Sequence, residues 1–152
     1  MNEDCELCTA PGGRVLFEDG FCRVVRPDDL DYPATVRVVL GRHARELSDL
    51  APAERWRLMR AVFAAEEAIR GVLAPAKMNV ASLGNLVPHV HWHLVPRRRD
   101  DRHFPAPVWG EPRRAAAPGW TAADLERLDA ALAARLATEF RGDAHDQGGA
   151  TR

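Results

Sequence analysis

The stretch Pro88-His89-Val90-His91-Trp92-His93-Leu94-Val95-Pro96 decides the fold, because three histidines alternate in it with apolar residues. Successive side chains of a β-strand point to opposite faces, so His89, His91 and His93 are expected in one row above a buried apolar face. Pro96 is expected to end this strand. Since the chain has only 6 histidines, a row of three predicts a functional site and not a packing feature.

Such a row leaves two kinds of chemistry open. Imidazoles have a pKa near neutral and can act as nucleophiles and proton donors, and neutral imidazoles also bind transition metals. Imidazoles at i, i+2 and i+4 of one strand have Cα atoms about 6–7 Å apart, so one ion would hold all three only on a strongly bent strand. This favours nucleophilic catalysis over a zinc hydrolase that uses the three histidines as ligands.

The composition predicts one globular domain with a hydrophobic core. The chain has 152 residues, 46% of them hydrophobic, and we expect a single domain over residues 1–140 and a disordered tail over 141–152. With 21 basic and 22 acidic side chains, the net charge of −1 gives no overall field that favours nucleic acid or a membrane surface. The polar start and the lack of a long apolar run predict a cytoplasmic protein without a membrane span.

Hydrophobic periodicity predicts the other elements and an α+β fold. Strands are expected over 14–18, 21–26, 35–40 and 77–82, and Asp19-Gly20 is typical of the hairpin turn between the first two. Apolar residues at spacings of three and four predict a long helix from Pro52 to Val72 and a last helix that begins after Thr121. With the histidine strand, this gives a five-stranded antiparallel sheet, one long helix packed on it and a C-terminal helix.

Two further segments carry polar or reactive side chains. The charged run 97–102 is expected at a solvated edge, although its position after the histidines could also place one arginine near a phosphate. A proline-rich coil that carries Trp109 follows it. Cys5 and Cys8 form a C-x-x-C pair, whose spacing suits half of a tetrahedral metal site better than a redox pair, although two unrelated thiols remain an alternative. Cys22 lies in a strand pattern and is expected in the core.

The combination of motifs resembles the histidine triad (HIT) family. Its signature is His89-Val90-His91-Trp92-His93-Leu94-Val95, followed here by Pro96-Arg97, with Gly41-Arg42-His43 upstream and a Gly84-Asn85 turn before the triad. The resemblance covers the chain from about Cys5 to Trp109. Within the family, the chain resembles the bacterial nucleotide hydrolases and transferases that are similar to diadenosine polyphosphate hydrolases. It implies cleavage of nucleoside phosphoanhydrides or phosphoramidates without a cofactor for the chemistry.

The resemblance also implies roles for individual residues. His91 would attack the α-phosphorus and form a nucleotidyl-histidine intermediate, and His93 would help the leaving group. His89 and His43 would pair behind the nucleophile. Three further residues would contact the nucleotide substrate, namely Asn85, Asn79 and Asp28.

Finally, the resemblance implies possible partners of the chain. Some bacterial relatives with an N-terminal C-x-x-C hold a structural zinc, and the matching ligands here are Cys5, Cys8, His43 and His89. Many relatives form a homodimer through the helix region. A non-catalytic nucleotide-binding or regulatory module on the same fold is the alternative function, although the intact His91 argues against it.

Overall fold

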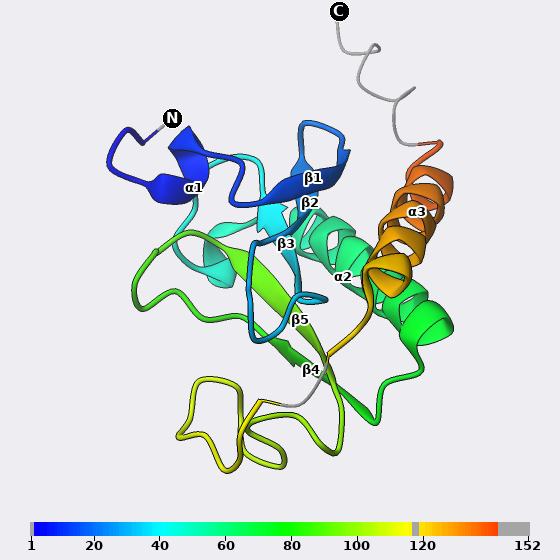
Figure 1. The fold of residues 1–152 in the computed structure, drawn as a ribbon. Coiled ribbons are helices and arrows are strands. Elements are labelled where there is room, and N and C mark those ends of the chain that lie inside the picture. Colours follow the sequence, from blue (N-terminus) through cyan, green and yellow to red (C-terminus); the bar gives the residue numbers. More distant parts are fainter. Residues whose placement is uncertain (1, 117–118, 143–152) are drawn as a thin grey trace, which may run out of the picture.

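The computed structural model describes residues 2–116 and 119–142 and has the predicted α+β architecture (Figure 1). The elements in chain order are α1 (Glu6–Thr9), β1 (Arg14–Glu18), β2 (Cys22–Arg26), β3 (Val36–Leu40), the 3₁₀ turn η1 (Leu47–Asp49), α2 (Pro52–Leu73), β4 (Lys77–Ala81), β5 (His91–Arg97) and α3 (Ala122–Glu139). The five strands pair antiparallel in the order β1-β2-β3-β5-β4. The predicted sheet and both main helices are confirmed, whereas α1 and η1 had no sequence signal. Of the expected disordered tail, residues 143–152 lie outside the described residues.

One face of the sheet packs against α2 and α3, which lie side by side (Figure 1). The register places Val24, Val38 and Trp92 beside one another on this face. Their apolar neighbours on the helices include Leu58, Ile69, Leu128, Leu132 and Leu136, all with 0% exposure. The histidines are therefore left on the opposite face, as the alternation predicts.

The N-terminal segment covers part of the histidine face. Cys5 and Leu7 of this segment pack against Val25 and Val39 on that face. Arg23 fixes the segment, because its guanidinium donates to the backbone oxygens of three residues, namely Leu7, Ala10 and Pro11. The remaining open part of the face lies over β3 and β5.

The predicted bounds of the histidine strand are wrong at both ends. His89 precedes β5, because its N–H donates to the carbonyl of Val87 across a tight turn at Pro88, with an N···O distance of 2.8 Å. The row on the strand therefore holds His91 and His93 alone. Pro96 does not end the strand, which continues to Arg97 with Pro96 opposite Met78 of β4, since a strand tolerates one missing donor where no neighbouring carbonyl needs it.

The predicted solvated edge over 97–102 is wrong for two of its residues. Arg97 has 1% exposure and forms a bidentate ion pair with Asp101, with N···O distances of 2.7 and 2.8 Å. Arg97 also donates to the Asn79 side chain and to the carbonyl of Ala106. This buried pair ties the coil after β5 to the end of the sheet.

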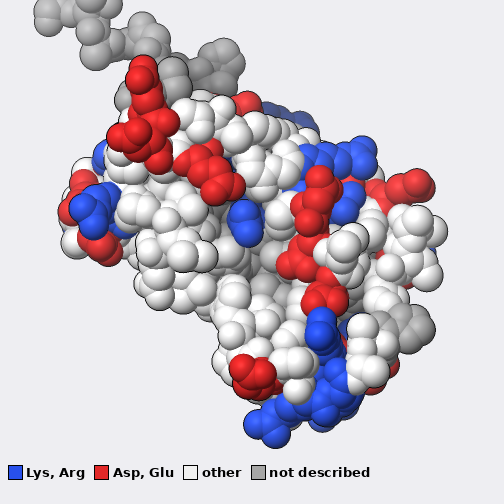
Figure 2. All heavy atoms as spheres, turned by 60° about the vertical axis from the view of Figure 1, so that its left-hand side comes forward, with Lys and Arg blue, Asp and Glu red and all other residues white. Residues whose placement is uncertain are grey.

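The surface carries charges of both signs. Figure 2 shows basic and acidic side chains interspersed around a hollow of mostly uncharged surface. Within the described ranges, no helix combines the length and the hydropathy that a membrane crossing requires.

Candidate active site

A cavity of about 480 Å³ opens on the free part of the histidine face. Its walls come from α1, β3, β5, the loop before β5 and the coil after it. The lining residues are Glu6, Leu7, Arg37, Leu83, Gly84, Asn85, Leu86, Val87, His91, His93 and Trp109. A space of this size accommodates a small-molecule ligand.

The hydrogen bonds of His91 and His93 define their tautomers. His91 Nδ1 lies 2.6 Å from the carbonyl oxygen of His89, so Nδ1 carries the proton and Nε2 carries the free electron pair. His91 Nε2 lies 3.0 Å from His93 Nε2, which must then be the donor. The pair thus places a nucleophilic nitrogen beside an imidazole N–H that can protonate a leaving group.

Burial keeps both imidazoles neutral. It lowers the pKa of His91, against the opposing hydrogen bond to the His89 carbonyl, and Arg37 lowers it further. For His93, burial and then the charges of His91 and Arg37 lower the pKa to about 4. A neutral His91 is the form that can attack phosphorus.

We expect His93 of the ligand-free protein to titrate near pH 4, well below the usual 6.5 of histidine. Because the folded-state pKa is lowered, neutral His93 contributes stability that is fully present above about pH 6.5 and is lost as the pH falls toward 4. NMR titration of the histidine ring signals checks this, with the His93 signal assigned by its loss in His93→Gln. A His93 midpoint near 6.5 would contradict it.

Trp109 and Asn85 complete the surroundings of the two histidines. The Trp109 ring stands edge-to-face on His93 with 5.4 Å between centroids, and 53% of Trp109 is exposed. Asn85 lies on the exposed loop before β5 and lines the same cavity, so it is free to meet a ligand.

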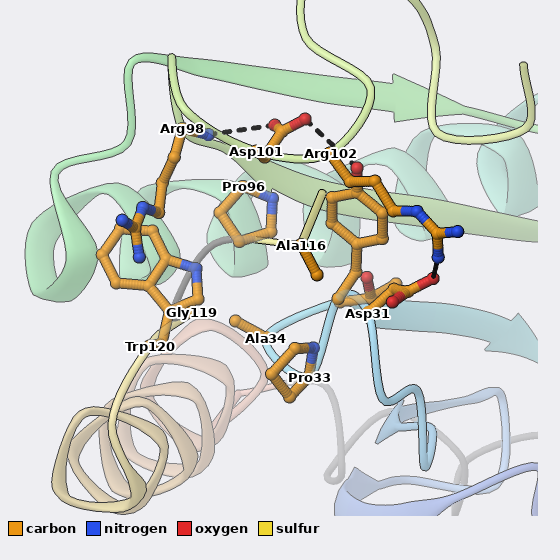
Figure 3. Close-up of a pocket in the computed structure, with 12 residues that line it drawn as sticks. Asp31, Pro33, Ala34, Pro96, Arg98, Asp101, Arg102, Ala116, Gly119 and Trp120 are labelled. Carbon is orange, nitrogen blue, oxygen red and sulfur yellow. Dashed lines mark hydrogen bonds and ion pairs between the residues drawn. The ribbon is translucent and has the colours of Figure 1, made fainter. Parts of the chain in front are cut away.

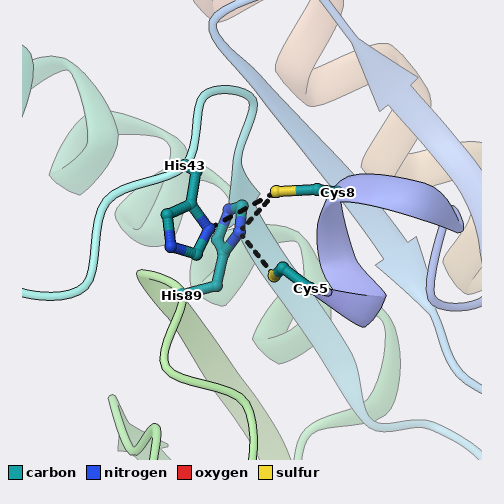
Figure 4. A group of neighbouring side chains, drawn as sticks. All are labelled: Cys5, Cys8, His43 and His89. Carbon is teal, nitrogen blue, oxygen red and sulfur yellow. Dashed lines mark hydrogen bonds between the residues drawn. The ribbon is translucent and has the colours of Figure 1, made fainter. Parts of the chain in front are cut away.

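Cys5, Cys8, His43 and His89 form a second cluster beside this cavity (Figure 4). One nitrogen or sulfur atom from each lies within 4.8 Å of the others. Nδ1 of His89 is 3.4 Å from Cys5 Sγ and 3.5 Å from Cys8 Sγ, and Nδ1 of His43 is 3.4 Å from Cys8 Sγ. The two thiols come from the α1 segment and the two rings from the loops at the ends of β3 and β5, so the cluster joins the N-terminus to the sheet.

His89 connects the cluster to the nucleophile. Its Nε2 donates to the carbonyl of Leu40 at 2.7 Å, which leaves Nδ1 unprotonated toward the sulfurs. Its backbone oxygen accepts from His91 Nδ1. The His43 and His89 rings do lie together, edge-to-face at 5.3 Å, but the group that orients His91 is the His89 carbonyl and not either imidazole.

The other two predicted substrate contacts lie outside this cavity. Asn79 shares the sheet face with His93 but accepts a hydrogen bond from Arg97 at 2.6 Å. Asp28 is an exposed residue of the loop between β2 and β3, and neither residue lines the histidine cavity. Sequence reasoning missed Arg37 at this site, although a lone charge in the apolar strand Val36–Leu40 could have been placed on the histidine face by alternation.

A second cavity lies between the loop before β3 and the segment before α3 (Figure 3). Proline, alanine and Trp120 form much of its wall, and an ion pair between Asp31 and Arg102 at 2.8 Å borders it. Its volume of about 30 Å³ suits a water molecule and not a nucleotide. The histidine cavity is therefore the candidate active site.

Fold, histidine pair and sequence agree with one class of protein. The HIT domain family model matches residues 12–100, more than half of the chain. The chain belongs to the histidine triad family.

Several individual members of the family are similar to this chain. A curated bis(5'-nucleosyl)-tetraphosphatase (asymmetrical) of Schizosaccharomyces pombe is 32% identical over 74 residues, which are 45% of this chain and 41% of the relative, so the chain spans less than half of it. A histidine triad protein from Marinobacter aquaeolei is 29% identical with a TM-score of 0.69, covering 91% of this chain and 98% of that one. A Zn-bound histidine triad family protein from Mycobacterium smegmatis shares the fold, with 24% identity, a TM-score of 0.61 and coverage of 89% and 96%.

Proposed function

We propose that the chain is a nucleotidyl hydrolase or transferase that cleaves nucleoside phosphoanhydrides or phosphoramidates through a nucleotidyl-histidine intermediate on His91. The observation that carries the proposal is the His91–His93 pair, with the nucleophilic Nε2 of His91 3.0 Å from Nε2 of His93. The family and the tetraphosphatase activity of the curated relative support hydrolysis at the level of class.

In the first half of the reaction, His91 Nε2 attacks the α-phosphorus, and a P–N bond forms. The bond from phosphorus to the leaving oxygen or nitrogen breaks, and the leaving atom takes the electron pair. In the substrate complex the phosphate charges favour the doubly protonated form of His93, which gives its Nε2 proton to that atom and becomes a neutral imidazole. The His89 carbonyl holds the Nδ1–H of His91 throughout, so the positive charge that develops on the attacking imidazole is partly compensated.

In the second half, water replaces His91 on phosphorus and the nucleoside monophosphate leaves. His93, now a neutral imidazole with a free electron pair on Nε2, takes a proton from this water and becomes doubly protonated again. Asn85 would donate its amide to phosphate oxygens, and its position on the cavity wall without a side-chain bond among the described residues supports this role. Contacts of Asn79 and Asp28 with the nucleotide stay predictions.

The test is chromatography of products after incubation with dinucleoside polyphosphates and with adenosine 5'-phosphoramidate. Release of the nucleoside monophosphate without added metal supports the proposal. Nucleotide binding with no product from any of these substrates would contradict it and favour the binding-module alternative.

The chemistry of the second cluster fits a structural zinc ion. Two thiolates and two imidazoles are the ligand set of tetrahedral zinc, whose neighbouring ligand atoms are about 3.4–3.8 Å apart. The three N···S separations of 3.4, 3.4 and 3.5 Å agree with this spacing. Bound there by Cys5, Cys8, His43 and His89, zinc would act as a cross-link between the N-terminal segment and the sheet.

Purified without added metal, the protein is expected to contain about one equivalent of zinc. Stripping it with a chelator should lower the thermal midpoint by about 5 °C or more, since ~2 kcal/mol shifts a domain of this size by that order. Burial raises the pKa of the Cys5 thiol, so without metal the thiol stays protonated. Elemental analysis measures the zinc content, and calorimetry measures the thermal midpoint. The control variant is Cys22→Ser, which changes a thiol outside the cluster and should leave the zinc content unchanged. Less than a tenth of an equivalent would contradict it.

A homodimer and a cytoplasmic location also stay predictions. On α2, Trp56 and Phe63 contact each other and are 64% and 45% exposed, which is consistent with an association surface on the helix side.

A further inference from the structure

Arg37 is the cation of the histidine cavity, and no step of the mechanism above uses it. Arg37 lies on β3 directly opposite His93, so both side chains stand on the same face of the sheet. Of the residues that line the cavity, Arg37 and Glu6 are the two with a formal charge, because the histidines are neutral.

The other partly buried arginines of the sheet have acceptors, and Arg37 does not. Arg23 donates to three backbone oxygens, and Arg26 forms a bidentate pair with Asp129 at 2.8 and 3.0 Å. Arg97 is bound to Asp101 in the same way. Across residues 2–116 and 119–142, no acceptor bonds the Arg37 guanidinium, and its Nε is buried without a partner. A buried polar group of this kind is costly unless a ligand satisfies it.

An anion with two oxygen atoms would satisfy the Arg37 guanidinium. A guanidinium is a planar fork that matches two oxygens of one phosphate group, and it keeps its charge at every physiological pH. Its neighbour across the strand pair, His93, is the residue that protonates the leaving group. The group nearest to both side chains is therefore the leaving side of the substrate.

We propose that Arg37 binds non-bridging oxygens of the phosphate that leaves, and thereby selects substrates with at least two consecutive phosphates. Phosphoramidates have an amine as leaving group and offer Arg37 no such oxygens. This inference rests on the proposed function, because it assigns the leaving side from the role of His93, and it resolves the choice between phosphoanhydrides and phosphoramidates in favour of the former.

The test compares kcat/KM of the wild type with Arg37→Met and Arg37→Lys on diadenosine tetraphosphate and on adenosine 5'-phosphoramidate. Arg37→Met is expected to lose on the order of 100-fold on the tetraphosphate and less than about threefold on the phosphoramidate. Arg37→Lys keeps the positive charge but lacks the planar guanidinium, so its kcat/KM on the tetraphosphate should lie between those of the wild type and Arg37→Met. The matched control is Arg127→Met, which removes an exposed arginine of α3. Equal losses on both substrates, or no loss on either, would overturn the inference.

Two further readouts separate this inference from the proposed function and from a structural role. If the wild type turns over neither substrate, the proposed function fails, and binding of ADP and AMP decides the inference. The inference is supported if Arg37→Met loses about tenfold or more in affinity for ADP but keeps its affinity for AMP. Equal losses of affinity for ADP and AMP overturn it. Ligand-free Arg37→Met should melt at or above the wild-type temperature, because an unpartnered charge is removed. A midpoint lower by more than about 5 °C would assign Arg37 a structural role instead.

Discussion

His91→Ala is expected to lower turnover of every substrate by roughly 10⁴-fold or more while leaving nucleotide binding within a few-fold of the wild type. The reason is that Nε2 of His91 is the nucleophile, and the other histidine of the cavity, His93, has its Nε2 proton directed toward it. Alanine removes the attacking atom without removing the cavity. The measurements are steady-state rates and nucleotide affinity, and undiminished turnover would contradict the role given to His91.

Two comparisons make the His91 test specific. Intact-mass measurement after rapid mixing should detect a nucleotidyl adduct in the wild type and none in His91→Ala. His93→Gln keeps the nucleophile but loses the proton donor, so it should still form the adduct, more slowly. An adduct that persists in His91→Ala would place the nucleophile elsewhere. Addition of imidazole to His91→Gly is expected to restore part of the rate, because a free imidazole can occupy the vacated space.

Local signals carry much of the fold. Alternation of apolar residues defines the strands because one sheet face is buried under α2 and α3. Thr121 and Asp124 form a capping box at the start of the predicted last helix, in which the Asp124 N–H donates to Thr121 Oγ1 at 3.2 Å and Thr121 N–H donates to Asp124 Oδ2 at 3.0 Å. These features depend on neighbours within a few residues, which a sequence displays directly.

Features that depend on distant partners were predicted less well. Buried Arg97 contacts Asn79 of β4 and Ala106 of the coil, and the local sequence of charged residues does not indicate either contact. The turn at Pro88 separates His89 from the strand, and the His89 ring lies beside Cys5 and Cys8 of the α1 segment. Strand alternation predicted that His91 and His93 share a face, and the family resemblance predicted the Cys/His cluster, whereas the register that sets Arg37 opposite His93 was visible only in the folded sheet.

Arg97→Met is expected to destabilise the protein by about 3–5 kcal/mol, the cost of leaving one partner of a buried ion pair alone. The Arg97 side chain has 2% exposure and that of Asp101 10%. Burial by itself would raise the pKa of Asp101, but hydrogen bonds from Arg97 and from the amides of His103 and Phe104 outweigh it and hold the pKa well below its usual range. Asp101 is therefore charged in the folded protein, and methionine leaves this charge without its counter-ion.

Thermal unfolding checks this prediction, with a midpoint expected to fall by about 10 °C. Arg102→Met is the matched control, because its ion pair with Asp31 is 39% and 44% exposed and such pairs contribute about 1 kcal/mol or less. Because the folded-state pKa of Asp101 is depressed, its ionisation contributes stability that is present above about pH 4 and is lost as the pH falls through the folded-state pKa. The difference in stability between the wild type and Arg97→Met should therefore shrink in acid. Arg97→Met/Asp101→Asn should recover part of the loss, because it removes the orphaned charge while the amide oxygen still accepts from the backbone amides of His103 and Phe104. If Arg97→Met costs no more than Arg102→Met, the pair does not hold the coil to the sheet.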